Sequence, residues 1–468
     1  VDHTTSVGSD HFPILCKVDI EFKTEQKYIH QKWAFKKANW KKYIEICDSM
    51  VNQVPELDQT VDEINNSISH FILVAASQSI PISQSKKNQT NVPCWNEKCK
   101  DSIKDRNRAF KELRRTLTMV NLIDYQKKKA IARRVIKEAK RDSWRQFCST
   151  IGRETTLNKV WMMVKKMIGK YKPSHIPILI EGGNTIILDT EKAKLLGKTF
   201  ANIHKGNHLD DRFKKRKEEI LKVNKDILKM REESMSALDV EFNIAELKMA
   251  LNSTGYSSPG SDNLCYAMLR QLPDKVLEKV LNLFNKVWNE GKLPKAWKKA
   301  TILPFPKPGK DPSNPENYRP IALTSHLGKL MEKLVVARLN YFLENKHLIR
   351  EYQTGFRKSK STTDALVILS NEVEKSLVMK ECMVAVFLDI EKAYDTMWRE
   401  GLLIKLESIG INGKMYNYIL DFLSQRTLRI KVGDGISEEF MVESGIPQGS
   451  VISPILFNIM INDIFEKL

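Results

Sequence analysis

Met383-Val-Ala-Val-Phe-Leu-Asp389 is a short apolar run that ends in a carboxylate. Its residues are apolar and partly β-branched, which is typical of a strand buried on both faces of a sheet. Asp389 needs a partner at the end of such a strand, because an unpaired buried charge is costly. Mg²⁺ is one suitable partner, since it prefers carboxylate oxygens. An aspartate that caps the next turn is the alternative, and the strand pattern alone does not separate the two.

Asp395 lies further along the chain, directly before the helical stretch 396–406. An aspartate in this position commonly accepts hydrogen bonds from the first N–H groups of the helix. We therefore predict that Asp395 is the N-cap residue of this helix, and we prefer this structural role to a catalytic one.

The loop Gly445-Ile-Pro-Gln-Gly-Ser450 contains two glycines, which let a backbone approach a ligand closely. Gln448 can both donate and accept hydrogen bonds. Ser453-Pro454 then predict the start of an apolar helix, because proline is favoured in the first helical turn. A helix entry without a ligand is the alternative interpretation of this loop.

A Pro/Gly-rich excursion lies within residues 303–323, and basic residues surround it: Lys307, Lys310 and Arg319. A flexible basic hairpin suits a triphosphate, which needs several cationic donors within reach. A proline-rich surface loop is the alternative, and it is favoured when this stretch is considered alone.

The stretch 353–364 leads into a helix. Ser361 and Asp364 predict a capping box for an apolar-periodic helix that follows. Cationic side chains directly before a helix N-terminus form a natural phosphate-binding arrangement. The residues in this position are Arg357, Lys358 and Lys360. A solvated basic turn is the alternative.

The chain has 468 residues, enough for roughly two or three domains with substantial cores. Its 76 Lys and Arg residues outnumber its 57 Asp and Glu residues, for a net charge of +19. Such a balance favours a polyanionic partner, nucleic acid before membrane, with a solubilising lysine-rich surface as the alternative. No apolar run approaches the ~20 residues that a membrane helix needs.

The seven cysteines are scattered, and Cys94 and Cys99 form the only close pair. No second pair of Cys or His lies nearby to complete a zinc site, so we predict free thiols in an intracellular protein. No signal peptide is recognisable. The first residue is Val1 rather than Met, so we expect a piece of a longer product.

Local patterns predict most of the remaining elements. Dense basic residues with helical apolar spacing predict a long helical hairpin over 96–148, with a turn near 116–122. Residues 155–205 predict a helix, a β-hairpin with its turn at Glu181-Gly-Gly-Asn184, and a second helix. Residues 206–238 predict an exposed helix of mixed charge. Asn243 and Glu246 predict a further capping box.

Five boxes follow one another in the second half of the chain. They are Asn317-Tyr-Arg-Pro-Ile321, Gly328-Lys-Leu-Met-Glu332, Gln353-Thr-Gly-Phe-Arg357, Phe387-Leu-Asp-Ile-Glu-Lys-Ala-Tyr-Asp395 and Gly445-Ile-Pro-Gln-Gly449. In this order they resemble the reverse transcriptases of non-LTR retrotransposons, the long-interspersed-element type, and most closely the jockey-like group. The resemblance extends from residue 240 to residue 468.

Ser9-Asp-His-Phe-Pro-Ile14 resembles the last box of the apurinic-type endonuclease that precedes the polymerase in these elements. The resemblance implies that Asp10 and His11 assist attack on a phosphodiester, with His11 at the phosphate or its nucleophile. The other endonuclease residues are absent from this sequence, so we expect no nicking by this chain.

The resemblance implies that the family joins a dNTP to a primer 3′-OH on an RNA template by two-metal displacement. Asp389 would ligate both Mg²⁺ ions, and the carbonyl of Ile390 would reach one of them.

The resemblance also implies contacts with the nucleotide. Arg319 would grip the triphosphate, with Lys307 as a weaker candidate. Tyr394 would lie under the sugar and clash with a 2′-OH, which selects dNTPs over rNTPs. Gln448 and Gly449 would line the surface for nucleotide and template.

The implied partners are an RNA template, a DNA primer or target, and dNTPs, with no membrane partner. The basic segments 96–148 and 357–360 would hold the template backbone with salt-sensitive affinity. The nucleus is the expected location of the parent element, with the cytoplasm as the alternative. The oligomeric state stays open.

We predict an α+β chain in which a helical connector precedes the fingers and palm of a right-hand polymerase. The expected ranges are 1–25 for the endonuclease remnant, 26–95 for a linker with helices, 96–205 for a basic helical connector, 206–240 for a charged helical linker, and 241–468 for reverse transcriptase fingers and partial palm.

The family's next box, an aromatic-Ala-Asp-Asp hairpin, carries the other catalytic carboxylates, and we expect it and the thumb to lie after Leu468. The fragment is therefore expected to be inactive alone. Asp463 is interpreted as a structural residue and not as a substitute for those carboxylates.

Two other functions stay open. A nucleic-acid-binding remnant of a decayed element would bind without a selective need for Asp389. An RNA-dependent RNA polymerase would also use a palm aspartate, but the bulk of Tyr394 disfavours rNTPs.

Overall fold

The computed structural model describes residues 31–51, 59–84, 93–152, 154–155, 157–168, 176–205, 210–232 and 238–464. The chain divides into two compact units. One consists of Val1–Lys32 and Gln84–His175, and the other of Trp33–Ser83 and Ile176–Leu468. The predicted endonuclease pair, Asp10 and His11, lies outside the described residues.

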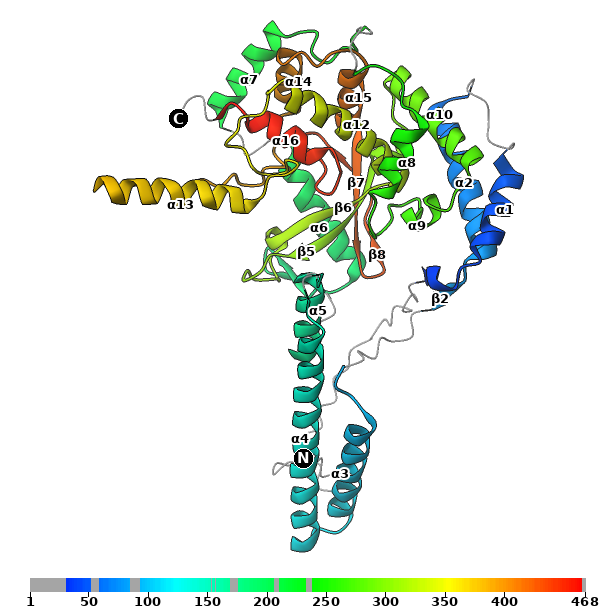
Figure 1. The fold of residues 1–468 in the computed structure, drawn as a ribbon, viewed down its shortest axis with the longest axis vertical. Helices are drawn as coiled ribbons and strands as arrows, with labels where there is room; N and C mark the ends of the chain where they lie inside the picture. Colours follow the sequence, from blue (N-terminus) through cyan, green and yellow to red (C-terminus); the bar gives the residue numbers. More distant parts are fainter. Residues whose placement is uncertain are drawn as a thin grey trace. The chain divides into compact units, whose positions relative to one another are not determined.

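The first unit is built on a helical hairpin of α3 (Glu97–Arg115) and α4 (Met119–Ser149), whose two arms lie side by side in Figure 1. Asn96 and Thr118 cap the two helices with their side chains. The rings of Phe110 and Tyr125 join the arms at 5.1 Å. The predicted hairpin and its turn are confirmed. Its two helices carry 17 Lys and Arg residues against 7 Asp and Glu residues, and nearly all are exposed.

The second unit contains a five-stranded sheet in the order β6-β5-β7-β8, with β9 paired to β7. β5 is antiparallel to β6 and parallel to β7, while β7 is antiparallel to β8 and β9. The strands are β5 (Lys299–Pro306), β6 (Tyr318–Leu323), β7 (Arg426–Val432), β8 (Gly435–Ile436) and β9 (Phe440–Val442). Together with the helices, this mixed sheet confirms the α+β class.

Helix α6 (Asp189–His204) packs on this sheet against β7, β8 and β9. Its Leu196 and Phe200 share a buried cluster with Ile302 and Ile430 of the strands. The hairpin β3 (Leu179–Glu181) and β4 (Asn184–Ile186) precedes α6, with Glu181 paired to Asn184 as the turn pattern predicted. α6 therefore belongs to the unit that holds the sheet, unlike the range 96–205 expected for a separate connector.

Helices form the larger core of the second unit. They are α1 (Trp40–Met50), α2 (Val61–Ser79), α8 (Ile244–Asn252), α9 (Tyr266–Leu269), α10 (Asp274–Glu290), α11 (Lys295–Lys298), α12 (His326–Asn345), α14 (Arg399–Ser408), α15 (Gly413–Leu423) and α16 (Ser453–Ile461). Their apolar faces are buried together, which supplies the hydrophobic stabilisation of the unit.

Helices α1 and α2 lie in the range expected for a linker, yet they pack into this core. Tyr43 donates its hydroxyl hydrogen bond to the carbonyl of Met268 at 3.3 Å, and Trp297 Nε1 donates to Asn65 Oδ1 at 2.9 Å. Apolar burial and these long-range bonds make the two helices part of the same compact unit as the sheet. The expected domain ranges stay predictions, and these two helices lie in the compact unit that holds the sheet.

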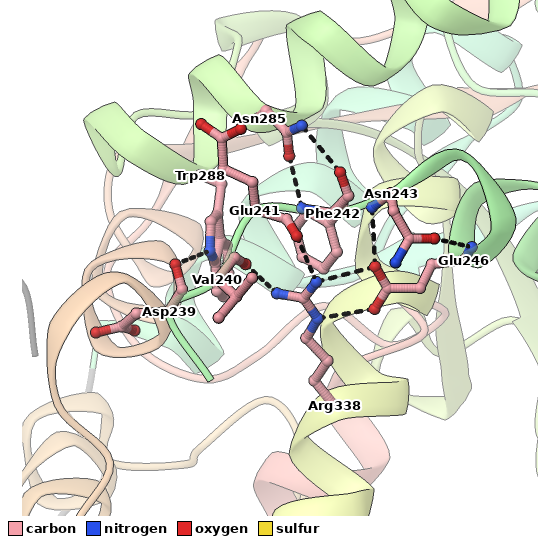
Figure 2. A network of polar contacts seen from close by, with 9 residues as sticks. All are labelled: Asp239, Val240, Glu241, Phe242, Asn243, Glu246, Asn285, Trp288 and Arg338. Atoms are coloured by element: carbon pink, nitrogen blue, oxygen red, sulfur yellow. Dashed lines mark hydrogen bonds and ion pairs between the residues drawn. The ribbon is translucent and has the colours of Figure 1, made fainter. Parts of the chain in front are cut away.

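Figure 2 shows how the start of α8 is fastened to α10 and α12. Arg338 makes a two-pronged ion pair with Glu246 at 2.9 Å, and its guanidinium lies 4.0 Å from the ring centre of Phe242. Asn285 exchanges two hydrogen bonds with the backbone of Phe242. Asn243 and Glu246 form the predicted capping box. Two-pronged Arg–carboxylate pairs are geometrically specific, so this pair fixes the position of the chain where α8 begins.

The apolar run before Asp389 differs from its prediction. Residues 381–390 form no helix or strand, and Phe387 and Leu388 are 83% and 74% exposed. The prediction of a strand buried on both faces is therefore wrong for this structure. Helix α13 (Thr362–Met379), which precedes the run, has no buried residue either. A strand needs partners for its backbone groups, and no described strand pairs with this run.

The remaining described elements are short or exposed. They are β1 (Gln31–Trp33), β2 (Ile82–Gln84), the 3-10 turns Phe35–Lys37 and Pro315–Asn317, α5 (Leu157–Ile168) and α7 (Asp211–Val223). α7 has no buried residue, as predicted. In the described part of the chain the cysteines are free thiols. No helix there is long and apolar enough to cross a membrane.

Candidate nucleotide site

A pocket of about 370 Å³ lies in the second unit, where the β5–β6 hairpin, the segment after Asp389 and the Gly445–Ser450 loop meet. Six of the residues predicted from the sequence to form a site line it. They are Lys307, Arg319, Asp389, Ile390, Tyr394 and Gln448. Helix α6 closes the same pocket with Phe200 and Ile203. The pocket therefore unites Lys307 with candidates that come from three separate boxes.

The two basic residues of the pocket are set by the β5–β6 hairpin. Arg319 lies on β6 opposite Phe305 of β5, and its side chain is exposed at the pocket. The backbone N–H of Lys307 donates to the carbonyl of Asn317 at 2.7 Å, which closes the hairpin. Lys307 Nζ donates to the carbonyl of Glu316 at 3.1 Å. Arg319 is thus the more available cation for an anionic ligand.

The segment 389–395 crosses the pocket as a tight turn. The N–H groups of Asp395 and Thr396 both donate to the carbonyl of Lys392, at 2.8 and 3.0 Å. The ring of Tyr394 stacks on Phe457 of α16, with centroids 5.3 Å apart and planes 25° apart. Burial raises the pKa of the Tyr394 hydroxyl, which keeps it neutral. This stacking fixes the ring at the pocket wall.

Asp395 is not the N-cap residue that the sequence predicted. Helix α14 begins later, with Trp398 at its N-cap and no side-chain cap. The carbonyl of Asp395 instead accepts from His204 Nδ1 at 3.0 Å. Asp395 lines the pocket, and burial raises the pKa of its carboxyl group to about 6, against the opposing effect of Lys392 and Lys307. The prediction failed because the chain turns once more before the helix starts.

The Gly445–Ser450 loop is joined to both other walls of the pocket. Gly445 N–H donates to the carbonyl of Met397 at 2.9 Å, and Ile446 N–H donates to that of Tyr394 at 2.8 Å. The carbonyl of Gln448 accepts from Ala322 N–H of β6 at 2.9 Å. A Cβ atom at Gly449, whose φ is +122°, would lie 2.8 Å from the carbonyl oxygen of Ala322. Glycine is required there for the close approach.

Two residues that the sequence analysis missed hold the start of this loop. Arg399 donates to three backbone carbonyls, of Gly445 at 2.7 Å, Val442 at 2.9 Å and Ser444 at 3.2 Å. His204 at the end of α6 binds the carbonyl of Ser444 at 2.9 Å. Burial lowers the pKa of both side chains, of Arg399 to about 10. No local pattern marks either residue, because each acts on segments distant in sequence.

The predicted template residues lie outside this pocket. Arg357 is held in a two-pronged ion pair with Glu344 at 2.9 and 2.6 Å, and it also donates to two backbone carbonyls. Lys358 and Lys360 are exposed beside the N-terminus of α13, whose predicted capping box is present. Of these three cations, the two lysines are therefore the ones available to a phosphate.

The carboxylates of the pocket give an incomplete set for a metal site. No group of three or more His, Cys, Asp or Glu residues that could hold an ion is found within the described ranges, which stop at residue 464. Asp389 and Asp395 both line the pocket. Asp463 forms an ion pair with Lys405, in keeping with its structural interpretation. These residues alone do not fit a two-ion centre.

Residues 305–468 match the family of reverse transcriptases, or RNA-dependent DNA polymerases. The chain is 34% identical over 207 residues to the probable RNA-directed DNA polymerase from transposon BS of Drosophila melanogaster, which is 44% of this chain and 23% of the relative. It is 36% identical over 206 residues to the RNA-directed DNA polymerase from mobile element jockey of the same species, 44% of this chain and 22% of the relative.

A more distant similarity covers nearly the whole chain. A putative 115 kDa protein of the type-1 retrotransposable element R1DM of Drosophila melanogaster is 23% identical over 459 residues, 93% of this chain and 40% of the relative. The chain therefore spans less than half the length of each of these relatives.

Proposed function

We propose that this chain, which belongs to the reverse transcriptase family of the jockey-like non-LTR type, supplies the nucleotide pocket of an RNA-directed DNA polymerase. The complete enzyme would add dNTPs to a primer 3′-OH on an RNA template. The observation that carries the proposal is the meeting of Lys307, Arg319, Asp389, Tyr394 and Gln448 around one pocket.

The chemistry of the pocket suits a deoxynucleoside triphosphate. The exposed guanidinium of Arg319 can donate two parallel hydrogen bonds to phosphate oxygens, with the ammonium of Lys307 beside it. Tyr394 is fixed by its stacking on Phe457, so its ring cannot swing away from a ribose 2′-OH. Gln448 adds a donor and an acceptor to the wall that the loop contributes.

Reverse transcriptases generally use divalent metal ions. We propose two Mg²⁺ ions for the complete enzyme, with Asp389 and the carbonyl of Ile390 as the ligands from this chain. We also propose that the chain alone does not extend a primer. Mg²⁺-dependent synthesis by the purified chain, lost in Asp389→Ala, would contradict this.

We propose that RNA and DNA bind along the exposed basic side chains of this chain. The helices α3 and α4 carry a large excess of basic residues, and Lys358 and Lys360 are exposed before α13. Binding of this kind weakens as salt rises, because each phosphate contact releases counterions. We therefore expect RNA binding by this chain to fall steeply between low and moderate salt.

Titration of the purified chain with dATP and with ATP tests the proposal. We expect dATP to bind more tightly than ATP, and Arg319→Ala to weaken dATP binding by about tenfold or more, as for loss of a charged hydrogen bond. Arg216→Ala removes the same charge from exposed α7, and it should leave dATP binding unchanged. Tyr394→Ala should reduce the preference for dATP over ATP.

The same titration separates the other candidate functions. A preference for ATP in the wild type would support an RNA polymerase. Binding of RNA without measurable binding of either nucleotide would support a nucleic-acid-binding remnant. Equal losses in Arg319→Ala and Arg216→Ala would show that dATP is held by general charge and not by this pocket.

A further inference from the structure

Glu332 is buried and makes none of the contacts proposed with the nucleotide. It lies on α12 within the box Gly328–Glu332, and its side chain is only 4% exposed. We infer that Glu332 is a positioning residue that holds the Gly445–Ser453 loop, and with it Gln448, in place for the incoming nucleotide. This inference rests on the proposed function, because the loop is a wall of the proposed nucleotide pocket.

The geometry of Glu332 is that of a helix cap supplied from another helix. Its Oε2 accepts from the backbone N–H of Val451 at 2.6 Å and from that of Ile452 at 3.2 Å. Ile452 is the N-cap residue of α16 and has no side chain that could cap it. The first N–H groups of a helix need an outside acceptor, and a negative charge is favoured there. Glu332 accepts from the N-cap N–H and from the N–H before it, while Ser450 Oγ accepts from that of Ser453.

Hydrogen bonds within the loop connect the amides that Glu332 binds to Gln448 at the pocket. Ser453 donates its hydroxyl to the carbonyl of Pro447 at 2.9 Å, and its N–H donates to Ser450 Oγ at 3.1 Å. Gln448 then follows Pro447 directly, and its carbonyl is bound to Ala322 of β6. Gln448 thus sits between two fixed points, one on β6 and one on α12.

Burial raises the pKa of the Glu332 carboxyl group, and cations from two elements oppose this effect. Arg426 of β7 and Lys329 of α12 both act electrostatically on Glu332, and Tyr418 of α15 faces the same group. Arg426 is itself fixed, because it donates to the carbonyls of Phe422 at 2.9 Å and Trp297 at 3.3 Å. A carboxylate that is desolvated and still hydrogen-bonded to two amides is a strong, specific anchor.

Hydrogen exchange and dATP titration of the full chain, run side by side, test the inference. We expect Glu332→Ala to speed exchange of the Val451 and Ile452 amides and to raise the Kd for dATP by about tenfold, as for loss of charged hydrogen bonds. Glu332→Gln keeps an acceptor, so it should recover part of both losses. RNA binding should stay unchanged in both variants.

Leu339→Ala is the matched control, since Leu339 is fully buried on the same helix and Glu332 is the residue of α12 that binds the loop amides. It should lower the unfolding temperature without changing the Kd for dATP or the exchange of those two amides. If Leu339→Ala raises the Kd as much as Glu332→Ala, Glu332 has only a structural role and the inference is overturned.

Hydrogen exchange in the wild type tests the anchor even when a variant fails to fold. Free exchange of the Val451 and Ile452 amides in the wild type would overturn it, whereas protection equal to that of α12 would support it. The proposed function fails separately, through absence of dATP binding in the wild type, while the exchange of the two amides still reports on the anchor.

Discussion

The two most informative stretches of the chain have opposite surroundings. The run 383–389 forms no strand and leaves Phe387 and Leu388 largely exposed. The stretch 445–461 is hydrogen-bonded to the turn at Tyr394, to β6 and to α12, and its Leu456 is fully buried. Both carry residues that line the pocket. The difference shows that one wall of the pocket is built by long-range contacts, while the aspartate ends an exposed run that belongs to no helix or strand.

The difference in burial between the two stretches has a physical cause. A helix satisfies most of its backbone hydrogen bonds internally, so α16 needs only a cap and an apolar surface to pack on. A strand satisfies none internally and depends on neighbours. The run 383–389 has the composition of a strand without a neighbouring strand in the described part of the chain.

The largest expected effect comes from matched leucine truncations in the two stretches. Leu456→Ala should reduce the free energy of unfolding by on the order of 4 kcal/mol, because Leu456 is 0% exposed and leaves a cavity. Leu388→Ala should change it by less than ~0.5 kcal/mol, because Leu388 is 74% exposed. Urea unfolding of both variants measures the difference. Equal losses would mean that the run is packed as tightly as α16.

A glycine pair gives the next largest effect. Gly445 has φ of +76°, and a Cβ there would collide with the backbone carbonyl of Asp395. We expect Gly445→Ala to cost about 3 kcal/mol of unfolding free energy, through strain and the displaced loop. Gly355→Ala is the control, since a Cβ at Gly355 meets nothing within 4 Å. A harmless Gly445→Ala would show that the loop can relax away from Asp395.

The stability of the chain should depend on pH through Asp395. Burial raises the pKa of this carboxyl to about 6, above its value of roughly 3.9 in an unfolded chain. The folded state therefore binds the proton more tightly, and stability falls as the pH rises from about 4 to about 6 and then stays low.

Asp395→Asn removes this proton and should be more stable than the wild type at pH 7, by on the order of 2 kcal/mol. Thermal unfolding of both proteins between pH 4 and pH 8 measures the gap. The gap should shrink toward zero at the acid end, and a gap that does not change with pH would rule out Asp395 as its source.

The smallest expected effect concerns RNA binding by two exposed lysines near the N-terminus of α13. Lys358 and Lys360 lie in the exposed turn before α13. Replacing both with Ala should weaken RNA binding several-fold at low salt and make the salt dependence shallower, because two phosphate contacts are lost. The matched pair is Lys222 at the end of α7 and Lys225 just after it, both exposed, and their replacement should not change binding. Filter binding over a salt series distinguishes the two pairs.

The sequence predicted local features of the fold well. The capping boxes at Asn243 and Ser361, the helical hairpin α3–α4 and the β3–β4 turn all depend on residues a few positions apart, and all were confirmed. Five of the pocket residues were predicted through their boxes and Lys307 through the basic Pro/Gly-rich stretch, and the structure brings these six together.

The sequence could not predict features that depend on distant segments. Arg399 and His204 bind backbone groups far away in the chain, so no local pattern marks them, and the box that contains Glu332 does not indicate which distant amides it binds. The run 383–389 is exposed, and α1 and α2 pack into the second unit. Both outcomes depend on which segments of the chain lie nearby in the fold, and amino-acid composition does not show this.

Photo-cross-linking of an azido derivative of dATP to the purified chain, followed by identification of the labelled peptides, tests the central claim most directly. We expect labels in the three segments that line the pocket, 305–323, 389–395 and 445–450, and competition by unlabelled dATP. Labels confined to the basic helices α3 and α4, with none in those three segments, would contradict it.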